Sequence, residues 1–530
     1  MVLSRWAVIC GMLSVLFGST ACAADPPPAK PSDPAVVHTD AGSVRGSVQH
    51  GTRVFQRIPY AAPPVGELRW RDPRPVAPWQ GVRDATKPSP SCAQNPGETA
   101  QPSDNEDCLY LNVTTPAKKP GKPKPVIVWI HGGVFMSGTS NGFDAKRWAN
   151  RGDAIVVTIN YRLGMLGNFG IKGLPGSGTF ALRDQQAALK WVQRNAAAFG
   201  GNPGNVTIAG QSAGAMSNCA HLTSPTAAGL FGKAIMQSGS CGTNWLKNFD
   251  APHKKAGAVF EPVTTVQRDG QQAAAELGCA KPDPRATIDC LRALPVKRLQ
   301  PVLSRFVHPA YHTAVLPEKP ADALREGHFR RVPVISGNVH DEGTMSAAAY
   351  ENGGPISEQT YDSVLGETFG ADRAKVAAEY PRAAYGSAAQ AFAAMITDRK
   401  WSCTQYADSR NMARYAPVHQ YEFADPAPPP MWAKPKMPMG TYHSSDIWSL
   451  FDLGGYPPQF SEEQKRLADQ IVDYWSGFAH NGKPEGPAWQ ALRSDAQTPY
   501  VQSLAPGTGG IHPVDLAAEH HCSFWKKLGK

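Results

Sequence analysis

Short apolar runs alternate with helical patterns along most of the chain. Residues 125–130 and 154–159 are rich in β-branched side chains, and similar runs cover residues 206–209, 233–236 and 332–335. Runs of this length and composition are typical of buried strands. Residues 182–199 carry apolar side chains at helical spacing before Gly200 and Gly201. Buried strands separated by helices indicate βαβ units. We therefore predict an α/β fold whose mostly parallel central sheet has helices on both faces.

The C-terminal third predicts another amphipathic helix. Ser461 and Gln464 have the spacing of a capping box, an apolar face follows, and Gly482 comes directly after it. No internal repeat or domain-separating linker interrupts the chain. The 50 glycines and 48 prolines among 530 residues indicate much irregular backbone. We expect one large domain over residues 36–530, with long loop and helical insertions.

The first residues indicate export. Arg5, an apolar run at residues 6–17 and the small residues that end at Ala23 have the pattern of a signal peptide over residues 1–23. A proline-rich segment at 24–35 is expected to be flexible. Lipid attachment at Cys22 is an alternative that Ser19 disfavours. No other run has the 18 or so apolar residues of a membrane span. The mature protein is therefore predicted to be secreted or periplasmic, without a transmembrane segment.

Composition narrows the class of protein and of partner. The chain is 42% hydrophobic and 18% charged, which is typical of a folded globular protein. Its formal net charge is +9, but the basic residues are scattered. Scattered charge favours solubility and is poor evidence for nucleic-acid binding. We expect a small-molecule partner and no nucleic acid, and the oligomeric state stays open.

The pattern Gly-x-Ser-x-Gly occurs twice, around Ser140 and around Ser212. A nucleophile elbow needs a buried strand directly before the serine and a helix directly after it, with small neighbours at the turn. Ser212 has the apolar run at 206–209 before it and Ala213-Gly214-Ala215 after it. Ser140 lies in a polar loop and is interpreted as structural. Ser212 is the candidate nucleophile.

Acyl transfer also needs donors for a developing oxyanion. Gly132 and Gly133 follow His131 directly after the predicted strand at 125–130. Glycines in such a loop let backbone N–H groups approach a substrate closely. Together with the backbone of Ala213, Gly132 and Gly133 form the candidate oxyanion hole.

The acid and the base follow the serine in α/β-hydrolases. Asp341 and Glu342 come after the predicted strand at 332–335, and the residues alone do not choose between them. His443 lies in a polar loop and is one of several downstream histidines, the others being His419, His480, His512, His520 and His521. No Cys/His cluster has zinc spacing. The chemistry requires no metal and no cofactor.

Several longer motifs carry a specific resemblance. They include Glu106-Asp107-Cys108-Leu109-Tyr110-Leu111-Asn112, Asn160-Tyr161-Arg162-Leu163-Gly164, Asp184-Gln185 and Phe199-Gly200-Gly201-Asn202-Pro203. With these motifs the chain resembles the type B carboxylesterase family, the cholinesterase-like branch of the α/β-hydrolases, as a secreted bacterial member. Matching segments run from Phe55 to Cys522 and so cover nearly all of the expected mature chain.

The resemblance implies an activity and a set of site residues. It implies a serine carboxylesterase that forms an acyl-enzyme on Ser212, with Glu342 as the acid and His443 as the base. It also implies the oxyanion hole of Gly132, Gly133 and Ala213. It further implies the disulfides Cys92–Cys108, Cys279–Cys290 and Cys403–Cys522, which leaves Cys219 and Cys241 as a fourth pair.

Departures from the family pattern bear on the substrate. Gln211 stands where the family often has glutamate, which removes a negative charge beside Ser212. Residues 93–107 contain no aromatic side chain, so the tryptophan with which cholinesterases hold a quaternary ammonium group is missing. A choline ester is therefore not expected. The alternatives are an esterase or lactonase dedicated to one natural product, or a non-catalytic binding protein of this fold; such proteins usually lack the serine or the histidine.

Overall fold

The computed structural model describes residues 33–96, 101–118, 121–431, 435–486 and 489–529. The predicted signal peptide at 1–23, Cys22 and most of the segment at 24–35 lie outside the described residues. Residues 34–530 form one compact unit by contact density. None of the described helices is both long and apolar enough to cross a membrane.

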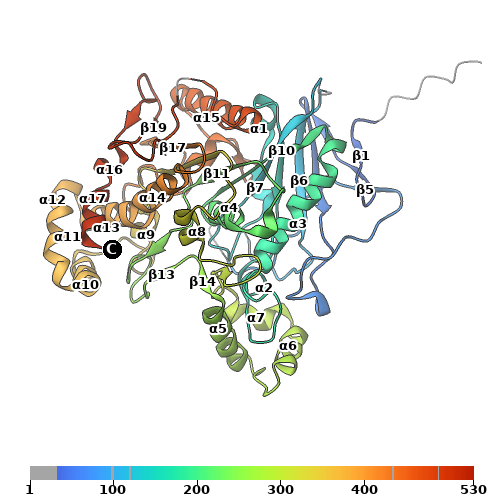
Figure 1. Cartoon of the computed structure of the whole chain (residues 1–530), viewed down its shortest axis with the longest axis horizontal. Coiled ribbons are helices and arrows are strands. Elements are labelled where there is room, and N and C mark those ends of the chain that lie inside the picture. Colours follow the sequence, from blue (N-terminus) through green and yellow to red (C-terminus); the bar gives the residue numbers. More distant parts are fainter. Residues whose placement is uncertain (1–32, 97–100, 119–120, 432–434, 487–488, 530) are drawn as a thin grey trace, which may run out of the picture. The chain divides into compact units, whose positions relative to one another are not determined.

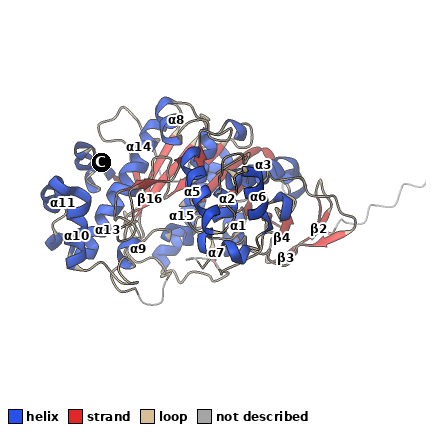
Figure 2. Ribbon diagram, turned by 90° about the horizontal axis from the view of Figure 1, so that it is seen from below, coloured by secondary structure: helices blue, strands red, loops and turns tan. Residues whose placement is uncertain are grey.

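An eleven-stranded mixed sheet forms the centre of this unit (Figures 1 and 2). Its strands, in spatial order, are β20 (Pro513–Val514), β19 (Val501–Leu504), β17 (Val418–Phe423), β16 (Val334–Val339), β11 (Lys233–Gln237), β10 (Gly201–Gln211), β7 (Lys124–Ile130), β9 (Ile155–Ile159), β6 (Tyr110–Pro116), β4 (Thr52–Pro59) and β3 (Ser47–Gln49). The strands from β19 to β9 are parallel, whereas β20 at one edge and β6, β4 and β3 at the other are antiparallel. The predicted mostly parallel sheet is therefore confirmed for its centre.

The predicted strands all occur, with two changes of extent. β10 starts at Gly201 and is longer than the apolar run at 206–209, with a register shift against β7 between Gly201 and Val206. β16 begins at Val334 and reaches Val339, later than the predicted 332–335. Pro333 accounts for the late start because proline has no N–H to donate and belongs at the beginning of a strand; its carbonyl accepts from Ala234 N at 3.1 Å.

Helices cover both faces of the sheet, so that each face has its own hydrophobic core. Strand β7 contributes side chains to both cores. Val126, Val128 and Ile130 pack into one cluster, while Ile127 and Trp129 pack into the other. This alternation follows from side chains pointing to opposite faces along a strand. The first face carries α3 (Phe180–Asn195), α4 (Ala213–Thr223) and α14 (Cys403–Met412), and the second carries α1 (Lys146–Arg151) and α15 (Glu462–Asn481). The predicted capping box is present at the start of α15, with both hydrogen bonds between Ser461 and Gln464 formed.

The insertions form two further groups of helices. One follows β11 and contains α5 (Val263–Glu276), α6 (Pro284–Ala293) and α7 (Val296–Leu303), which pack together with α2 (Gly164–Asn168). The other lies between β16 and β17 and contains α9 (Thr344–Ala348), α10 (Glu358–Phe369), α11 (Arg373–Glu379), α12 (Arg382–Tyr385), α13 (Ala388–Ile396), a π-helical turn at Thr397–Ser402 and α14. Figure 1 shows α5 to α7 at the bottom of the view and α10 to α13 at the left.

Shorter elements complete the described residues. The remaining α-helices are α8 (Pro320–Glu326), α16 (Leu516–Glu519) and α17 (Cys522–Leu528). Small sheets are formed by β1 (Val36–His38) with β2 (Ser43–Arg45) and β5 (Val82–Asp84), by β12 (Asn244–Trp245) with β13 (Gly257–Ala258), by β14 (Glu261–Pro262) with β15 (Ala310–Tyr311), and by β18 (Asp452–Leu453) with β8 (Phe143–Asp144).

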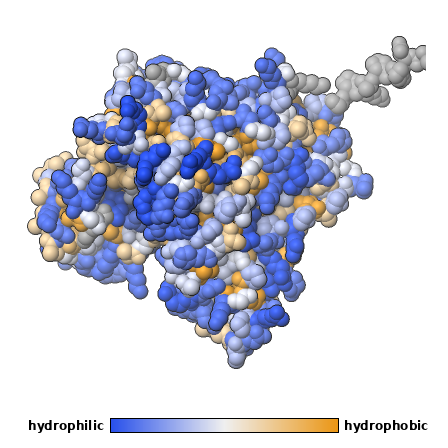
Figure 3. All heavy atoms as spheres, in the orientation of Figure 1, coloured by the Kyte–Doolittle hydropathy of each residue, from blue (hydrophilic) through white to orange (hydrophobic). Residues whose placement is uncertain are grey.

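The eight cysteines downstream of residue 23 are joined in four disulfides. The pairs are Cys92–Cys108, Cys219–Cys241, Cys279–Cys290 and Cys403–Cys522. These are the pairs that the resemblance implied, together with the remaining fourth pair. On the face seen in Figure 3, hydrophilic residues predominate and apolar ones are scattered, as expected for a protein with a water-exposed surface.

Candidate active site

Ser212 occupies a sharp turn between β10 and α4. Its backbone angles are φ 56° and ψ −124°, and the residue is 8% exposed. Positive φ in a non-glycine residue is strained and persists only where the surroundings enforce it. Here Ser212 N donates to Gln237 O of β11 at 2.9 Å, while Ser212 O accepts from Met216 N in the first turn of α4 at 2.9 Å. The strand, turn and helix of a nucleophile elbow are therefore present at Ser212.

The small residue after Ala213 allows the helix to approach the sheet. A Cβ atom on Gly214 would lie 1.9 Å from Ile130 O at the end of β7. Only glycine accommodates this contact between α4 and β7 without displacement of the backbone. The second glycine of the Gly-x-Ser-x-Gly motif thus brings the serine next to the loop that follows β7.

That loop carries the candidate oxyanion donors. A Cβ atom on Gly132 would lie 3.0 Å from Ser212 Cβ and 2.9 Å from Gln211 O, so the Gly132 backbone is adjacent to the serine. Within the described part of the chain, no acceptor contacts the N–H groups of Gly132, Gly133 or Ala213. Gly132 lies beside the serine, Gly133 follows it in the loop and Ala213 follows the serine, and unpaired backbone donors next to a nucleophile can stabilise a tetrahedral oxyanion.

His131, the first residue of this loop, is held in place by Tyr161 and by the neighbouring Gly132. Its carbonyl accepts from Tyr161 OH at 2.8 Å, its Nδ1 lies 2.8 Å from Gly132 O, and its ring stacks on Tyr161 at 4.4 Å between centroids. Burial lowers the pKa of His131 to about 4. The ring is therefore neutral at physiological pH and serves as a buried support for the glycines.

The candidate acid and base are in direct contact. Glu342 follows β16 and is 2% exposed; its Oε2 is hydrogen-bonded to His443 Nδ1. Its Oε1 accepts from Val339 N at 3.0 Å, which fixes the carboxylate. A carboxylate that holds Nδ1 of a histidine sets the tautomer in which Nε2 is free to accept a proton.

Asp341, the other candidate acid, has a different position. Its Oδ1 lies 3.0 Å from His340 Nδ1, and its Oδ2 accepts from Thr441 N at 2.8 Å. Asp341 N also donates to Thr441 O at 3.1 Å. Asp341 therefore holds the loop that carries His443 against the loop that carries Glu342. The geometry favours Glu342 as the acid and Asp341 as a support.

The other downstream histidines lie elsewhere in the described structure. His419 is on β17, where burial lowers its pKa to about 4. The contacts of the remaining four are His480 Nε2 with Gly152 O, His512 Nδ1 with Gly509 O, His520 with Asp398 and Glu422, and His521 with Glu379. Among the described contacts, His443 is the downstream histidine that meets a candidate acid and the residue next to Ser212.

The Ser212 hydroxyl has no hydrogen bond to His443 among the described contacts. Instead, His443 Nε2 lies 3.1 Å from Nε2 of Gln211, the residue directly before the serine. Free enzymes often have long or misaligned catalytic hydrogen bonds that tighten only when substrate binds. The candidate acid and base are thus in contact, and the amide of Gln211, the residue before the candidate nucleophile, lies against Nε2 of His443.

Trp401 is a site residue that the sequence analysis missed. Its ring lies against the ring of His443 at 4.6 Å between centroids and 35° between planes. Trp401 belongs to the π-helical turn at Thr397–Ser402, and such turns are frequent at functional sites. The Trp401 ring also has a cation near it, since Lys400 Nζ lies 4.9 Å from its centroid. The same ammonium group forms an ion pair with Asp250 at 2.5 Å. No local sequence pattern links this tryptophan to the histidine.

Asp446 is a second carboxyl group close enough to His443 to interact with it electrostatically. It is fully buried, and its Oδ2 accepts from Gln237 Nε2 at 2.8 Å and from Tyr421 OH at 3.0 Å. Burial, more than the neighbouring Glu342, raises the pKa of Asp446 to about 6. Its Oδ1 has no partner among the described residues.

The decoy serine is built into the structure differently. Ser140 is 1% exposed in the 3-10 turn Ser140–Gly142, and its N donates to Asn160 Oδ1 at 2.7 Å. Its hydroxyl accepts from Asn112 Nδ2 at 3.3 Å. Ser140 is thus enclosed by a polar network, in agreement with a structural role.

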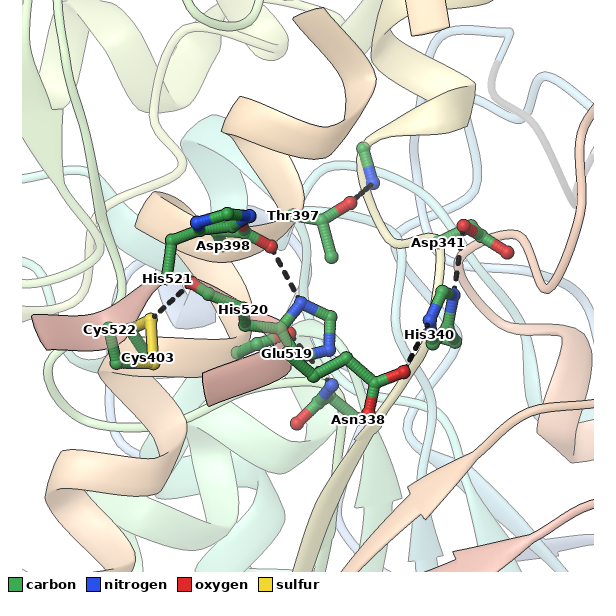
Figure 4. A network of polar contacts seen from close by, with 12 residues as sticks. Asn338, His340, Asp341, Thr397, Asp398, Cys403, Glu519, His520, His521 and Cys522 are labelled. Atoms are coloured by element: carbon green, nitrogen blue, oxygen red, sulfur yellow. Dashed lines mark hydrogen bonds and ion pairs between the residues drawn. A yellow bond between two sulfur atoms is a disulfide. The ribbon is translucent and has the colours of Figure 1, made fainter. Parts of the chain in front are cut away.

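A network of histidines and carboxylates joins the segment that follows β16 to the C-terminal segment (Figure 4). His340 is bonded to Asp341 and Glu519, and His520 to Asp398 at 2.6 Å and Glu422 at 2.5 Å. The ligand atoms of His340, Glu422 and His520 lie within 4.8 Å of one another. Both nitrogens of each ring already meet a carboxylate, however, and a metal needs an unprotonated nitrogen.

Protonated rings fit this network better than a metal ion. Hydrogen bonds from Asp341 and Glu519 raise the pKa of His340 to about 10. Burial alone would lower the pKa of His520, but Glu422 and Asp398 outweigh it and hold that pKa well above its ordinary value. The network is therefore a set of ion pairs that supports the loops of Glu342 and His443. The Cys403–Cys522 disulfide lies next to it, with Cys403 Sγ 3.2 Å from His520 O.

Comparison with known proteins identifies the family. A sequence model described as the carboxylesterase family matches residues 33–525. The chain belongs to the carboxylesterase family. Para-nitrobenzyl esterase of Bacillus subtilis is 34% identical over 480 residues, spanning 87% of this chain and 93% of that protein. Cocaine esterase of Homo sapiens is 31% identical over 564 residues, spanning 98% of this chain and 95% of that protein.

A solved structure gives the same result for the fold. A PNB esterase superposes with a TM-score of 0.75 at 30% identity, covering 93% of this chain and 100% of the other. The α/β-hydrolase fold and the resemblance to the type B carboxylesterases are thereby confirmed. This carboxylesterase is accordingly an enzyme that acts on carboxylic ester bonds.

Proposed function

We propose that this carboxylesterase hydrolyses esters through an acyl-enzyme on Ser212, with His443 as the base and Glu342 as the acid. One observation carries the proposal. The Glu342 carboxylate is hydrogen-bonded to Nδ1 of His443, and Nε2 of the same ring lies 3.1 Å from the amide of the residue before Ser212. A ring oriented by a carboxylate beside a strained serine is the arrangement of a serine hydrolase.

The proposed reaction has two stages. His443 Nε2 takes the proton of the Ser212 hydroxyl while Oγ bonds to the ester carbonyl carbon, and the N–H groups of Gly132, Gly133 and Ala213 stabilise the oxyanion. The tetrahedral intermediate then breaks its bond to the alcohol oxygen, which receives the proton from His443. A water molecule then gives a proton to His443 while its oxygen attacks the acyl carbon. The second tetrahedral intermediate breaks its bond to Ser212 Oγ, which receives the proton from His443, and the carboxylic acid is released. Glu342 stabilises the ring whenever it is protonated.

The test compares Ser212 with the decoy serine. Turnover of p-nitrophenyl esters of graded acyl length is followed for the wild type, Ser212→Ala and Ser140→Ala. If the triad acts as a unit, Ser212→Ala lowers kcat by on the order of a millionfold. Ser140→Ala is the matched control and stays active, apart from any loss of stability. A loss of less than tenfold in Ser212→Ala contradicts the assignment.

The ester is proposed at the level of its class. The relatives are called para-nitrobenzyl esterase and cocaine esterase, so aryl and alkyl carboxylic esters are the first substrates to examine. Activity on short neutral esters supports a broad carboxylesterase. If the folded wild type turns over none of the graded series but a bulky natural ester or lactone is hydrolysed, the narrow alternative replaces it.

We further propose that the chain is exported and that the mature protein begins at Ala24, with residues 36–530 as its single domain. Four disulfides among the described residues support an oxidising compartment. Intact-mass measurement of the extracytoplasmic protein is expected to give the mass that starts at Ala24. A chain that retains residues 1–23, or carries lipid on Cys22, contradicts the proposal.

A further inference from the structure

The residue before the nucleophile departs from the family pattern and touches the base. Gln211 replaces the glutamate that the family often has, and it is 4% exposed. Its side-chain Nε2 lies 3.1 Å from His443 Nε2. The amide therefore occupies the lone pair to which Ser212 must give its proton.

The protonation of the ring fixes the direction of this hydrogen bond. Glu342 meets Nδ1 of His443, and a carboxylate only accepts, so Nδ1 carries the proton. In the neutral ring Nε2 then has a lone pair and no hydrogen. The Gln211 amide N–H donates to that lone pair, a hydrogen bond that the doubly protonated ring cannot accept.

We propose that Gln211 is a positioning residue that holds His443 ready to accept the proton of Ser212 and then turns its amide so that the oxygen accepts from the protonated ring. This inference rests on the proposed function of Ser212, Glu342 and His443. Glutamine suits both forms of the ring because its amide carries a donor and an acceptor at one end. An ionised glutamate at this position has only acceptor atoms, so it could form a hydrogen bond with Nε2 of His443 only when that nitrogen is protonated.

The other groups facing His443 do not take over this task. Glu342 holds Nδ1, and Trp401 covers the face of the ring, with Lys400 over the Trp401 ring. Asp446 is close enough to interact with the ring electrostatically, but its hydrogen bonds go to Gln237 and Tyr421. Among the described residues, Gln211 is the one that forms a hydrogen bond with Nε2 of His443.

Packing keeps the Gln211 side chain in this place. A Cβ atom on Gly132 would lie 3.0 Å from Gln211 Oε1, so the amide lies between the oxyanion loop and the base. It therefore touches two parts of the proposed catalytic apparatus and can exchange its N–H and C=O ends by rotation about one bond.

The pH dependence of kcat/KM distinguishes this role from a merely structural one. Wild type, Gln211→Glu and Gln211→Met are compared on p-nitrophenyl acetate, a neutral ester. Because a carboxylate next to the ring favours its charged form, Gln211→Glu is expected to move the acid limb of the profile to higher pH by about 1–2 pH units. Gln211→Met keeps the length but removes the N–H, so its acid limb moves up by about 0.5 pH units.

Gln271→Glu is the matched control. Gln271 is exposed on α5, so this substitution adds the same charge on the surface and is expected to leave the profile unchanged. Thermal melts establish that each variant is folded; if Gln211→Glu does not fold, Gln211→Met carries the comparison. Acid limbs that superimpose on the wild-type limb, or a Gln211→Met limb at lower pH, overturn the inference. Failure of the proposed function is recognised separately, because turnover then survives Ser212→Ala.

Discussion

Gly132→Ala tests the oxyanion hole with the smallest side chain that the site excludes. The added Cβ would lie 2.9 Å from Gln211 O, 3.0 Å from Gln211 Oε1 and 3.0 Å from Ser212 Cβ. Ordinary contacts of this kind are about 3.5 Å or longer, so the loop must move by about 0.5 Å, which uses up the whole tolerance on the position of a catalytic group. Loss of one oxyanion donor lowers kcat by about 10²–10³, or about 2.7–4 kcal/mol.

Steady-state turnover of p-nitrophenyl acetate measures this effect. We expect kcat to fall by about 10²–10³ with a much smaller change in KM, because the donor acts on the transition state. Gly142→Ala is the matched control, since no atom lies within 4 Å of its added Cβ. It is expected to keep kcat within about twofold. A Gly132→Ala enzyme that is folded and keeps kcat within threefold of the wild type refutes the placement of the oxyanion hole at this loop.

Three further predictions concern stability. Asp184→Asn leaves the charge of Arg162, which is paired with Asp184 at 2.7 Å, buried without its partner; urea unfolding is expected to show a loss of about 3–5 kcal/mol, and a loss below 1 kcal/mol contradicts this. Replacing Cys219 and Cys241 by serine opens a bridge over 22 positions and is expected to lower the free energy of unfolding by about 3 kcal/mol; an unchanged urea midpoint argues against the bridge. Burial raises the pKa of Asp446 from 3.8 to about 6, so the stability that this carboxyl group contributes is fully present below pH 3.8 and is lost as the pH rises through 6. Relative to the wild type, Asp446→Asn should therefore gain about 3 kcal/mol between about pH 4 and pH 7, and a pH-independent difference contradicts the assignment.

The centre of the fold could be predicted because its local signals and its burial agree. The run at 125–130 is β-branched and is buried on both faces as β7, so composition alone indicates the strand. α15 has its capping box at Ser461 and its left-handed glycine at Gly482. In both cases the sequence pattern and the tertiary position demand the same structure.

β17 shows why other elements were harder to predict. It contains His419, Gln420 and Glu422, all buried, within the run Val418–Phe423. Glu422 is tolerated there because His520, from the C-terminal segment, is bonded to it at 2.5 Å. Such a partner is known only from the tertiary structure, and polar residues in a buried strand weaken the apolar signal.

The site follows the same division. Ser212 could be found because its elbow is a local motif, and Gly132 and Gly133 because they follow a strand. The residues alone left Asp341 and Glu342 open, and the structure separates them by their partners, Thr441 for one and His443 for the other. Trp401 reaches His443 through a π-helical turn within an insertion, and no sequence periodicity predicts that contact.

Active-site labelling tests the central claim most directly. The purified wild type and His443→Ala are treated with a fluorophosphonate, which forms a stable bond to an activated serine, and the labelled peptide is identified by mass spectrometry. We expect one adduct per chain on Ser212 in the wild type, loss of ester turnover in step with labelling, and labelling slowed at least a hundredfold in His443→Ala, since general-base catalysis contributes about 10²–10⁴-fold. An adduct on Ser140, or full ester turnover in a protein labelled on Ser212, contradicts the account.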